Sequence, residues 1–427
     1  MTDPMCSAIS RRRFLTGLGA AAATATVGRY AVTVFTREPL PGMTTTVPVA
    51  TPTASTARAA GAPTNRTLVV VELGGGNDGL SMVVPHATDA YYDLRRQTAI
   101  VDPIDLDGFI GLHPNLSYLA ESFRQGDLAI VEGVGYPDSD LSHFVSMATW
   151  WTASPGFDIH TGWLGRYLDA TVGFDHPLAG ITIGPGPSQA MAGAASFAVS
   201  IEDMSGLQPA LPDWMDGADE LLSSWAGMVP ATVTDDLLGE AHRVIGQTQS
   251  ARLNLNGRLA GQASGGRPRL ADQFGLAAEL ITSGTPPQVL YVHGIGDFDT
   301  HENQTRRHGD MMADLDGAIG AFFGSLEAAG AADDVLVLTA SEFGRRARDN
   351  GSGTDHGTAS THLLIGPAVS GGRYGEMPSL VRNDTAGNMT PTVDFRSVYA
   401  SVLAEWLEVD PVEILGTGFE QLGMISM

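Results

Sequence analysis

From residue 67 onward, apolar residues form short continuous runs, and longer segments with helical periodicity separate these runs. Runs without alternating polar positions are typical of strands that are buried on both faces of a parallel sheet. The predicted strands are Leu68–Leu73, Leu128–Val134, Ala179–Ile183, Val289–Val292, Val335–Thr339 and Leu363–Ile365. The predicted helices are Leu116–Arg124, Leu141–Trp151, Trp163–Thr171, Leu237–Gln249, Leu270–Thr282, Met311–Ala329 and a last helix that Asp394 caps and that runs through Trp406. This alternation predicts an α/β fold with a mostly parallel central sheet and helices on both faces.

The first 66 residues differ from the rest of the chain. Ser10 to Leu15 read S-R-R-R-F-L and precede a weakly apolar Ala/Gly-rich stretch, which is the pattern of a twin-arginine (Tat) signal. Residues 38–66 are rich in Pro, Thr and Ala, a composition that predicts a disordered linker. We therefore predict a Tat signal region at 1–37, the linker at 38–66, and a single α/β domain at 67–427 with an insertion or cap around 185–270.

The signal predicts export through the Tat translocon to a periplasmic or extracellular location. Its apolar stretch ends at Arg29 and is too short to span a bilayer, so we expect no permanent membrane anchor. The only cysteine, Cys6, lies upstream of the expected cleavage point, so the exported protein would have no cysteine nucleophile or ligand.

The charged residues exclude further functions. All 24 basic residues are arginines, and the formal net charge of the 427-residue chain is −24. Without lysine there is no Schiff-base chemistry and no phosphate-loop lysine. The excess of acidic residues disfavours nucleic acid and anionic membranes as partners.

A glycine-rich loop follows the first predicted strand, in the sequence VVVELGGGNDGLS. Gly74, Gly76 and Gly79 fit the G-x-G-x-x-G pattern of dinucleotide-binding loops, and Asp102 follows at a suitable distance. Such a loop must open a long helix, yet Pro85 interrupts the segment soon after. The second interpretation is a sharp turn at the strand end that presents Asp78, and the third is a tight turn with solvated polar residues.

Carboxylates and histidines follow several predicted strands. Open α/β sheets bind ligands beyond the carboxyl ends of their strands, so we expect these side chains to share one edge. Carboxylate and imidazole groups together suit a divalent cation, whereas without one so many acids would repel each other. The candidate ligands are Asp78, Asp297, Asp299, His301, Glu342, Asp355 and His356. The cation would be zinc, manganese or calcium, and the sequence does not select among them. Taken singly, each of these residues also fits a cap, a turn or, for Glu342, an ion pair with a neighbouring arginine.

The segment GYPDSDLSHFVSMATWWTA offers a nucleophile at a predicted helix start. Ser139 or Ser142 would lie beside backbone N–H groups that can hold an oxyanion, and a nearby cation would lower the pKa of the hydroxyl. Plain N-capping by Asp138 or Ser139 explains the same residues. His143 would lie one position inside the helix.

Five long blocks resemble the bacterial family called domain of unknown function 1501. These blocks are LVVVELGGGNDGLSMVVP, LHPNLSYLAESFRQGDLAIVEGVGYPDSDLSHFVSMATWWTA, GWLGRYLD, GDFDTHENQ and LTASEFGRRARDNGSGTDHGTA. The resemblance extends over about residues 67–410. Members of that family commonly begin with a Tat signal, as we predict for this chain, and have no settled activity.

The family is similar in fold to the alkaline-phosphatase superfamily, which places two metals at strand ends and a Ser or Thr nucleophile at a helix start. By motif, the resemblance implies ligand roles for the acid Asp78, for a mid-chain pair of Asp299 or Asp297 with His301, and for Glu342 and His356. It implies a nucleophile at Ser139 or Ser142, with His143 beside it. One departure is Glu342-Phe343 where the superfamily has Asp followed by His, which removes an imidazole ligand.

The resulting hypothesis is an exported metal-dependent hydrolase of phosphate or sulfate esters, with Arg345 holding the anionic group of a small ester substrate by two parallel hydrogen bonds. The alternative is an exported binding protein that kept the sheet and lost the reaction. A third, a nucleotide-dependent oxidoreductase, depends on the glycine loop alone.

Overall fold

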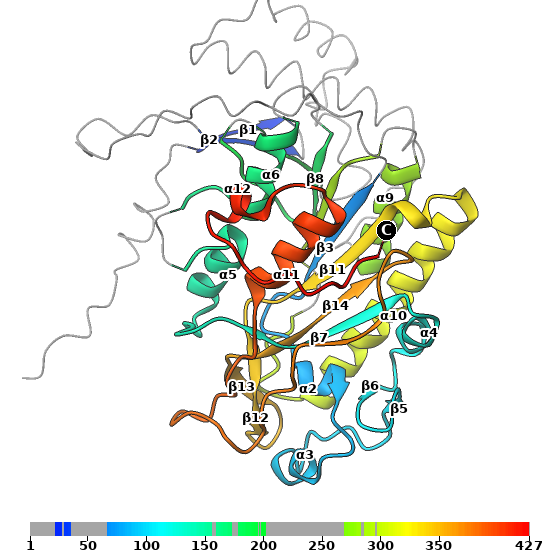
Figure 1. Ribbon diagram of the computed structural model, residues 1–427, viewed down its shortest axis with the longest axis vertical. Helices are drawn as coiled ribbons and strands as arrows, with labels where there is room; N and C mark the ends of the chain where they lie inside the picture. The colour runs from blue at the N-terminus through cyan, green and yellow to red at the C-terminus, as the bar shows by residue number, and fades with distance from the viewer. Residues whose placement is uncertain are drawn as a thin grey trace, which may run out of the picture.

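The structure is a computed structural model, and it describes residues 22–27, 30–35, 66–155, 159–172, 178–194, 196, 198–201, 269–282, 286–294 and 297–426. The motif at residues 10–15, the linker, most of the expected insertion around 185–270 and the helix expected at 237–249 lie outside these residues. Figure 1 shows a central sheet between two layers of helices. The predicted α/β class is thereby confirmed.

The central sheet has nine strands, and all six predicted strands belong to it. Along the sheet the order is β15-β7-β14-β11-β3-β10-β8-β9, with β16 paired to β7. The strands are β15 (Gly372–Tyr374), β7 (Leu128–Gly135), β14 (Ser360–Ile365), β11 (Val335–Ala340), β3 (Thr67–Glu72), β10 (Val289–Val292), β8 (Gly180–Ile183), β9 (Val199–Ile201) and β16 (Val393–Asp394). Neighbours are parallel except that β14 runs antiparallel to both β11 and β7.

The side chains of β3 point alternately to the two faces of the sheet, and both faces are covered by helices. Val69 and Val71 pack into one core, and Leu68 and Val70 pack into a second core on the opposite face. The first core holds α4 (Ser117–Gln125), α9 (Leu270–Thr282) and α10 (Gln304–Ala329). The second holds α5 (His143–Thr152), α6 (Trp163–Thr171), α11 (Phe395–Ser401) and α12 (Pro411–Leu415). Because successive strand side chains point to opposite faces, a continuous apolar run serves both layers at once.

Smaller elements surround this sandwich. They comprise α2 (Gly79–Met82), α3 (Asp89–Leu94), the three-stranded sheet of β4 (Val83–Val84), β5 (Ile104–Asp105) and β6 (Gly111–Leu112), and the antiparallel pair of β12 (Gly344–Asp349) and β13 (Thr354–Gly357). Short 3₁₀ turns occupy Gln189–Met191 and Ala332–Asp334, and a π-helical turn occupies Val402–Trp406. Within the region predicted as the signal, β1 (Ala22–Val27) and β2 (Tyr30–Phe35) form an antiparallel pair.

Two helix boundaries differ from the expectation. α10 begins at Gln304, seven positions before the predicted start at Met311, because its first turns carry the polar sequence QTRRHGD, whose buried members bond to other polar side chains. The last helix passes into the π-helical turn after Ser401. Among the described residues, none of the helices has the length and apolar character needed to span a membrane.

Candidate metal centre

One edge of the central sheet gathers most of the predicted site residues. The strands β3, β10, β11 and β7 run in the same direction and end at this edge. Because β14 runs the opposite way, it begins there, and the β12–β13 pair that precedes it also lies at this edge. The antiparallel strand therefore explains how residues before β14 meet residues that follow parallel strands.

Asp299 lies at the centre of this cluster. Its Oδ1 is 2.9 Å from Nε2 of His301 and 3.0 Å from Nε2 of His356. Its Oδ2 is 3.6 Å from Nε2 of His143. The Nε2 atoms of His301 and His356 are themselves 3.1 Å apart. Three imidazoles thus direct the same ring nitrogen at one carboxylate.

The other nitrogen of each ring is held by an oxygen acceptor. Nδ1 of His143 is 2.9 Å from Oε1 of Glu342, and Nδ1 of His301 is 3.3 Å from Oδ1 of Asp355. Nδ1 of His356 is 2.9 Å from the carbonyl oxygen of Leu141. Since a carbonyl only accepts hydrogen bonds, the Nδ1 of His356 carries the proton and Nε2 of the neutral ring carries a lone pair. This arrangement is typical of metal-binding histidines, whose second nitrogen donates to a carboxylate or carbonyl.

The donor atoms are close enough to form a shared site. One donor atom each from His143, Asp299 and His356 lie within 4.8 Å of one another, the one such group among the residues that the structure describes. A neutral imidazole lone pair facing a carboxylate oxygen is unfavourable unless a cation or a proton lies between them. Two imidazoles and one carboxylate form the donor set of many zinc sites that keep an open coordination position. The residues present therefore fit a divalent cation of the zinc type.

Burial and hydrogen bonding shift the pKa values of three side chains in the cluster. Partial burial acts to raise the pKa of Asp299, but the hydrogen bond and charge of Arg345 outweigh it and lower the pKa to about 2. Burial lowers the pKa of His356. The hydrogen bond to Glu342 raises the pKa of His143. The shifts favour an anionic Asp299 and a neutral His356, as metal binding requires, whereas the raised pKa of His143 favours its protonated form.

Glu342 lies beside the group as a partner of His143. Its carboxylate is buried, and Oε1 accepts hydrogen bonds both from the backbone N–H of Gly75 and from His143. Asp355 holds His301 in the same way and also contacts Asn350, and its pKa is lowered first by the hydrogen bond from Asn350. Both residues were predicted as ligands, and the structure places an oxygen of each beside the Nδ1 atom of an imidazole.

Asp78 has a different environment from the one expected for a ligand. It is completely buried, caps α2 and forms an ion pair with Arg95, which is also fully buried. Ser81 and Gln304 donate further hydrogen bonds to it. Burial acts to raise its pKa, but the charge of Arg95 outweighs this and lowers the pKa to about 2. Both carboxylate oxygens are therefore occupied by the protein's own donors.

Two further predicted residues lie outside the cation group. Asp297 is largely exposed and pairs with Arg307 at 2.9 Å, so of the two candidate aspartates only Asp299 enters the cluster. Arg345 is fully buried, and its guanidinium bonds to four backbone carbonyls besides Asp299. Because the side chain is shielded from solvent and bonded to these acceptors, it is not placed for the expected two-pronged hold on a substrate anion.

The two candidate nucleophiles differ in exposure. Ser142 is exposed, stands at the N-cap of α5 and makes no capping hydrogen bond with its side chain. Its backbone N–H donates to Asp140. Ser139 is partly buried, and its hydroxyl is enclosed without a hydrogen-bond partner among the described residues. Ser142 directly precedes His143, the first residue of α5, so of the two candidate serines it is the nearer in the chain to the cation group.

The glycine loop contacts this cluster and does not open a long helix. The helix that follows it, α2, has only four residues, which is shorter than a dinucleotide site requires. Gly75 and Gly76 have φ values of +114° and +79°, in the region that favours glycine. A Cβ on Gly75 would lie 2.4 Å from the backbone nitrogen of Asp299, and one on Gly76 would strike the ring of Phe343. The glycines therefore permit close packing against the residues around Asp299.

Sequence reasoning did not include Glu72, the last residue of β3. Its buried Oε2 accepts hydrogen bonds from the hydroxyl of Tyr291 at 2.5 Å and the indole of Trp151 at 2.8 Å. Burial raises its pKa. The sequence does show an acidic residue at the end of an apolar run. Such a position indicates a buried carboxyl group, which needs hydrogen-bonding partners.

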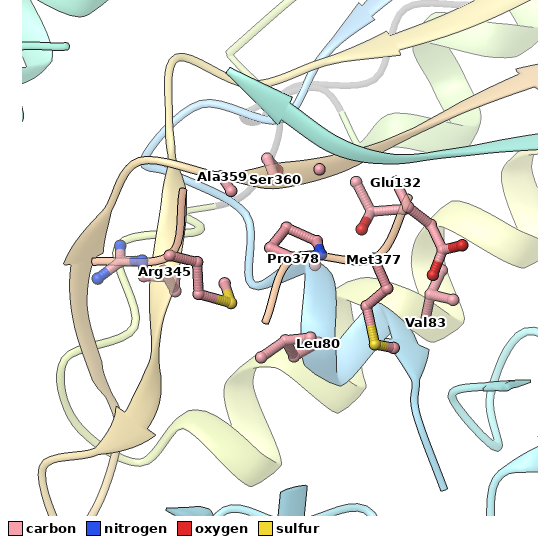
Figure 2. A pocket seen from close by; sticks show the side chains of 12 residues that line it. Leu80, Val83, Glu132, Arg345, Ala359, Ser360, Met377 and Pro378 are labelled. Carbon is pink, nitrogen blue, oxygen red and sulfur yellow. The ribbon is translucent and has the colours of Figure 1, made fainter. Parts of the chain in front are cut away.

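A pocket lies between residues of α2, β7 and β14. The side chains around it include Leu80, Val83, Glu132, Ser360 and Met377. Figure 2 shows the aliphatic part of Arg345 at one end of this pocket, with its guanidinium pointing away from the other labelled side chains. This pocket is therefore separate from the cation group.

Part of the chain is similar to a known sequence family. Residues 241–408 match a family profile. The family is "Protein of unknown function (DUF1501)". The match confirms the predicted resemblance over this segment, which contains Asp299, Glu342 and His356. A search of the curated proteins found no match.

Several solved structures of alkaline-phosphatase and sulfatase type are similar to this chain at low identity. A protein in the alkaline phosphatase superfamily from Vibrio parahaemolyticus has 11% identity and a TM-score of 0.38, over 83% of this chain and 70% of that one. The PsFucS1 sulfatase from Pseudoalteromonas sp. has 10% identity and a TM-score of 0.36, over 85% and 70%. The phosphonate monoester hydrolase of Agrobacterium radiobacter has 10% identity and a TM-score of 0.33, over 79% and 73%. We base the α/β class on the sheet topology above, and the chemistry on the chain's own residues.

Proposed function

We propose that the protein is a divalent-metal-dependent hydrolase of small phosphate or sulfate esters. The observation that carries this proposal is the convergence of the Nε2 atoms of His143, His301 and His356 on the carboxylate of Asp299, with each opposite nitrogen held by an oxygen. Such an arrangement supplies lone pairs and negative charge at one point. A cation bound there would polarise an ester oxygen and lower the pKa of a nearby hydroxyl.

The chain's own groups would act around that point. His143, Asp299 and His356 would hold the cation, and they are partly exposed, so a small anionic ester can approach. We assign the nucleophile to Ser142, because its exposed hydroxyl makes no capping bond. The net reaction consumes one water and releases an alcohol and an inorganic anion.

The experiment is metal analysis of the purified full chain, followed by assays with aryl phosphate and aryl sulfate esters. We expect about one zinc-type cation per chain and turnover that His356→Ala abolishes. Ser142→Ala should abolish turnover and keep the metal, whereas Ser139→Ala should retain turnover. A protein that binds no divalent cation in any of these preparations contradicts the proposal.

A second candidate function is an exported binding protein that holds a cation without turnover. It is favoured by one observation: the side chain of Arg345 is completely shielded from solvent and bonds to backbone carbonyls and Asp299, so it is not placed to bind a substrate anion. Bound metal together with no hydrolysis of any ester in the screen would support this candidate.

Export through the Tat translocon is a separate proposal, which rests on the twin-arginine sequence at residues 11–12. Replacing both arginines by lysine should retain the protein in the cytoplasm of its host. Unchanged export of that variant contradicts the proposal.

A further inference from the structure

The glycine loop, residues 74–77, contacts both sides of the candidate metal centre through two buried charged side chains. We propose that Glu342 and Arg345 are positioning residues, which fix His143 and Asp299 by tying them to the backbone of this loop. The inference rests on the proposed metal site and assigns these two residues a role other than ligand or substrate clamp.

The Glu342 connection has two hydrogen bonds to one oxygen. Oε1 lies 2.8 Å from the backbone nitrogen of Gly75 and 2.9 Å from Nδ1 of His143. The backbone N–H fixes the position of that oxygen, and the oxygen in turn fixes the plane and the tautomer of the imidazole. Because Nδ1 of His143 donates to Glu342, its Nε2 keeps a lone pair that faces Asp299.

The Arg345 connection reaches the other member of the pair. Its Nη2 lies 2.5 Å from the carbonyl oxygen of Gly75 and 2.6 Å from Oδ1 of Asp299, and its Nε lies 2.7 Å from the carbonyl oxygen of Gly76. The planar guanidinium holds these three acceptors in a fixed relation. The carboxylate of Asp299 is therefore placed relative to the same loop that places His143.

The loop backbone reaches both residues only because it is glycine. At Gly75 the positive φ and the 2.4 Å approach of a built Cβ to the nitrogen of Asp299 leave no room for another side chain. Gly75 also supplies both an N–H to Glu342 and a carbonyl to Arg345. One peptide segment thus serves as a common reference for two groups of the metal centre.

The test separates positioning from ligation with Glu342→Gln and Glu342→Ala. Histidine ¹⁵N NMR of the metal-free full chain, at a pH where imidazoles are neutral, reports the tautomer of His143. Competition with a chromophoric chelator reports the zinc affinity. Gln keeps an oxygen that can accept both hydrogen bonds, so we expect the Nδ1–H tautomer and most of the affinity to remain. Ala removes the acceptor, and we expect a mixed tautomer and an affinity about 10- to 100-fold weaker.

Asp297→Asn is the matched control, because this carboxylate lies near Asp299 in sequence but pairs with Arg307 at the surface. It should change neither readout. Arg345→Lys keeps the charge and loses the planar fork, so we expect weaker zinc binding with the tautomer of His143 unchanged.

Glu342→Gln that binds zinc as poorly as His356→Ala would show that Glu342 is a ligand and overturn the inference. An unchanged tautomer and affinity in a folded Glu342→Ala would overturn it as well. If wild-type protein binds no zinc, the proposed function fails, while the tautomer in the metal-free protein still decides whether Glu342 orients His143.

Discussion

The guanidinium of Arg345 lies 2.6 Å from Oδ1 of Asp299, and its side chain is completely shielded from solvent while that of Asp299 is 34% exposed. The buried guanidinium therefore balances the charge of a carboxylate that solvent or a ligand can reach. Its remaining hydrogen bonds end on the carbonyls of Gly75, Gly76, Phe298 and Thr354. This relationship joins three segments of the chain below the candidate metal centre.

Replacing Arg345 by methionine should destabilise the fold. It leaves buried carbonyls without a donor and Asp299 without its counter-ion, so we expect a loss of at least about 3 kcal/mol in the free energy of unfolding. Urea denaturation of the metal-free protein measures this loss. Arg346→Met is the control, because its partner Asp355 is 3.9 Å away and half exposed, and it should cost less than about 1 kcal/mol. Equal losses in the two variants would contradict the prediction.

The buried pair of Asp78 and Arg95 should make stability depend on acid pH. Burial opposes ionisation of Asp78, but the charge of Arg95 lowers its pKa from 3.8 to about 2. A folded-state pKa below the unfolded value adds stability above the unfolded value, and this stability is lost as pH falls from about 4 to about 2. We expect a contribution of about 2 kcal/mol, from the size of that shift. Urea denaturation at several pH values in this range measures the free energy of unfolding, which should change less with pH in Asp78→Asn than in wild type. An equal change with pH in the two proteins would contradict the assignment.

The contribution of Glu72 to stability should decrease as pH rises, opposite to that of Asp78. Burial raises its pKa above 4.5, so the folded protein favours its protonated form. Stability from this group is complete below the unfolded pKa and declines as pH rises through the folded value. Glu72→Gln keeps an oxygen acceptor for Tyr291 and Trp151 without a charge. We expect it to unfold at a higher temperature than wild type at pH 7 and at about the same temperature at pH 4. A lower temperature at pH 7 would show that the charged form is favoured.

Zinc should stabilise the folded chain, because it binds the assembled donors and not the unfolded ones. Free zinc at 100 times its dissociation constant adds about 2.7 kcal/mol to stability. Differential scanning fluorimetry should show a higher melting temperature with zinc and a return to the starting value with a chelator. His356→Ala should abolish the response, whereas His86→Ala, a surface histidine paired with Asp105, should keep it. A full response in His356→Ala would place the ion elsewhere.

Gly75→Ala tests the close approach of the glycine loop. An alanine here must adopt a φ of +114° and place its Cβ 2.4 Å from the nitrogen of Asp299. The backbone must shift, so we expect a destabilisation of about 1 to 3 kcal/mol and weaker zinc binding. Gly108→Ala is the control, since its φ is also positive at +83° but no atom lies within 4 Å of a built Cβ. It should be destabilised without losing zinc affinity.

The sequence by itself determined the α/β class, the positions of all six predicted strands and the cluster containing Asp299, His301 and His356. These features depend on local chemistry: continuous apolar runs become buried strands, and polar residues beyond parallel strand ends meet at one edge. The same reasoning placed Glu342 and Asp355 at that edge.

Only the tertiary structure decided the direction in which each side chain points and the partner it meets. Arg95, at the end of α3, pairs with Asp78, and Arg307 pairs with Asp297. His356, in β13, meets the carbonyl of Leu141, which selects the tautomer of the ring. A buried polar or charged group needs a hydrogen-bonding or ionic partner, because burial without one is unfavourable. That partner is often far away in the chain, so only the tertiary fold determines which residue it is.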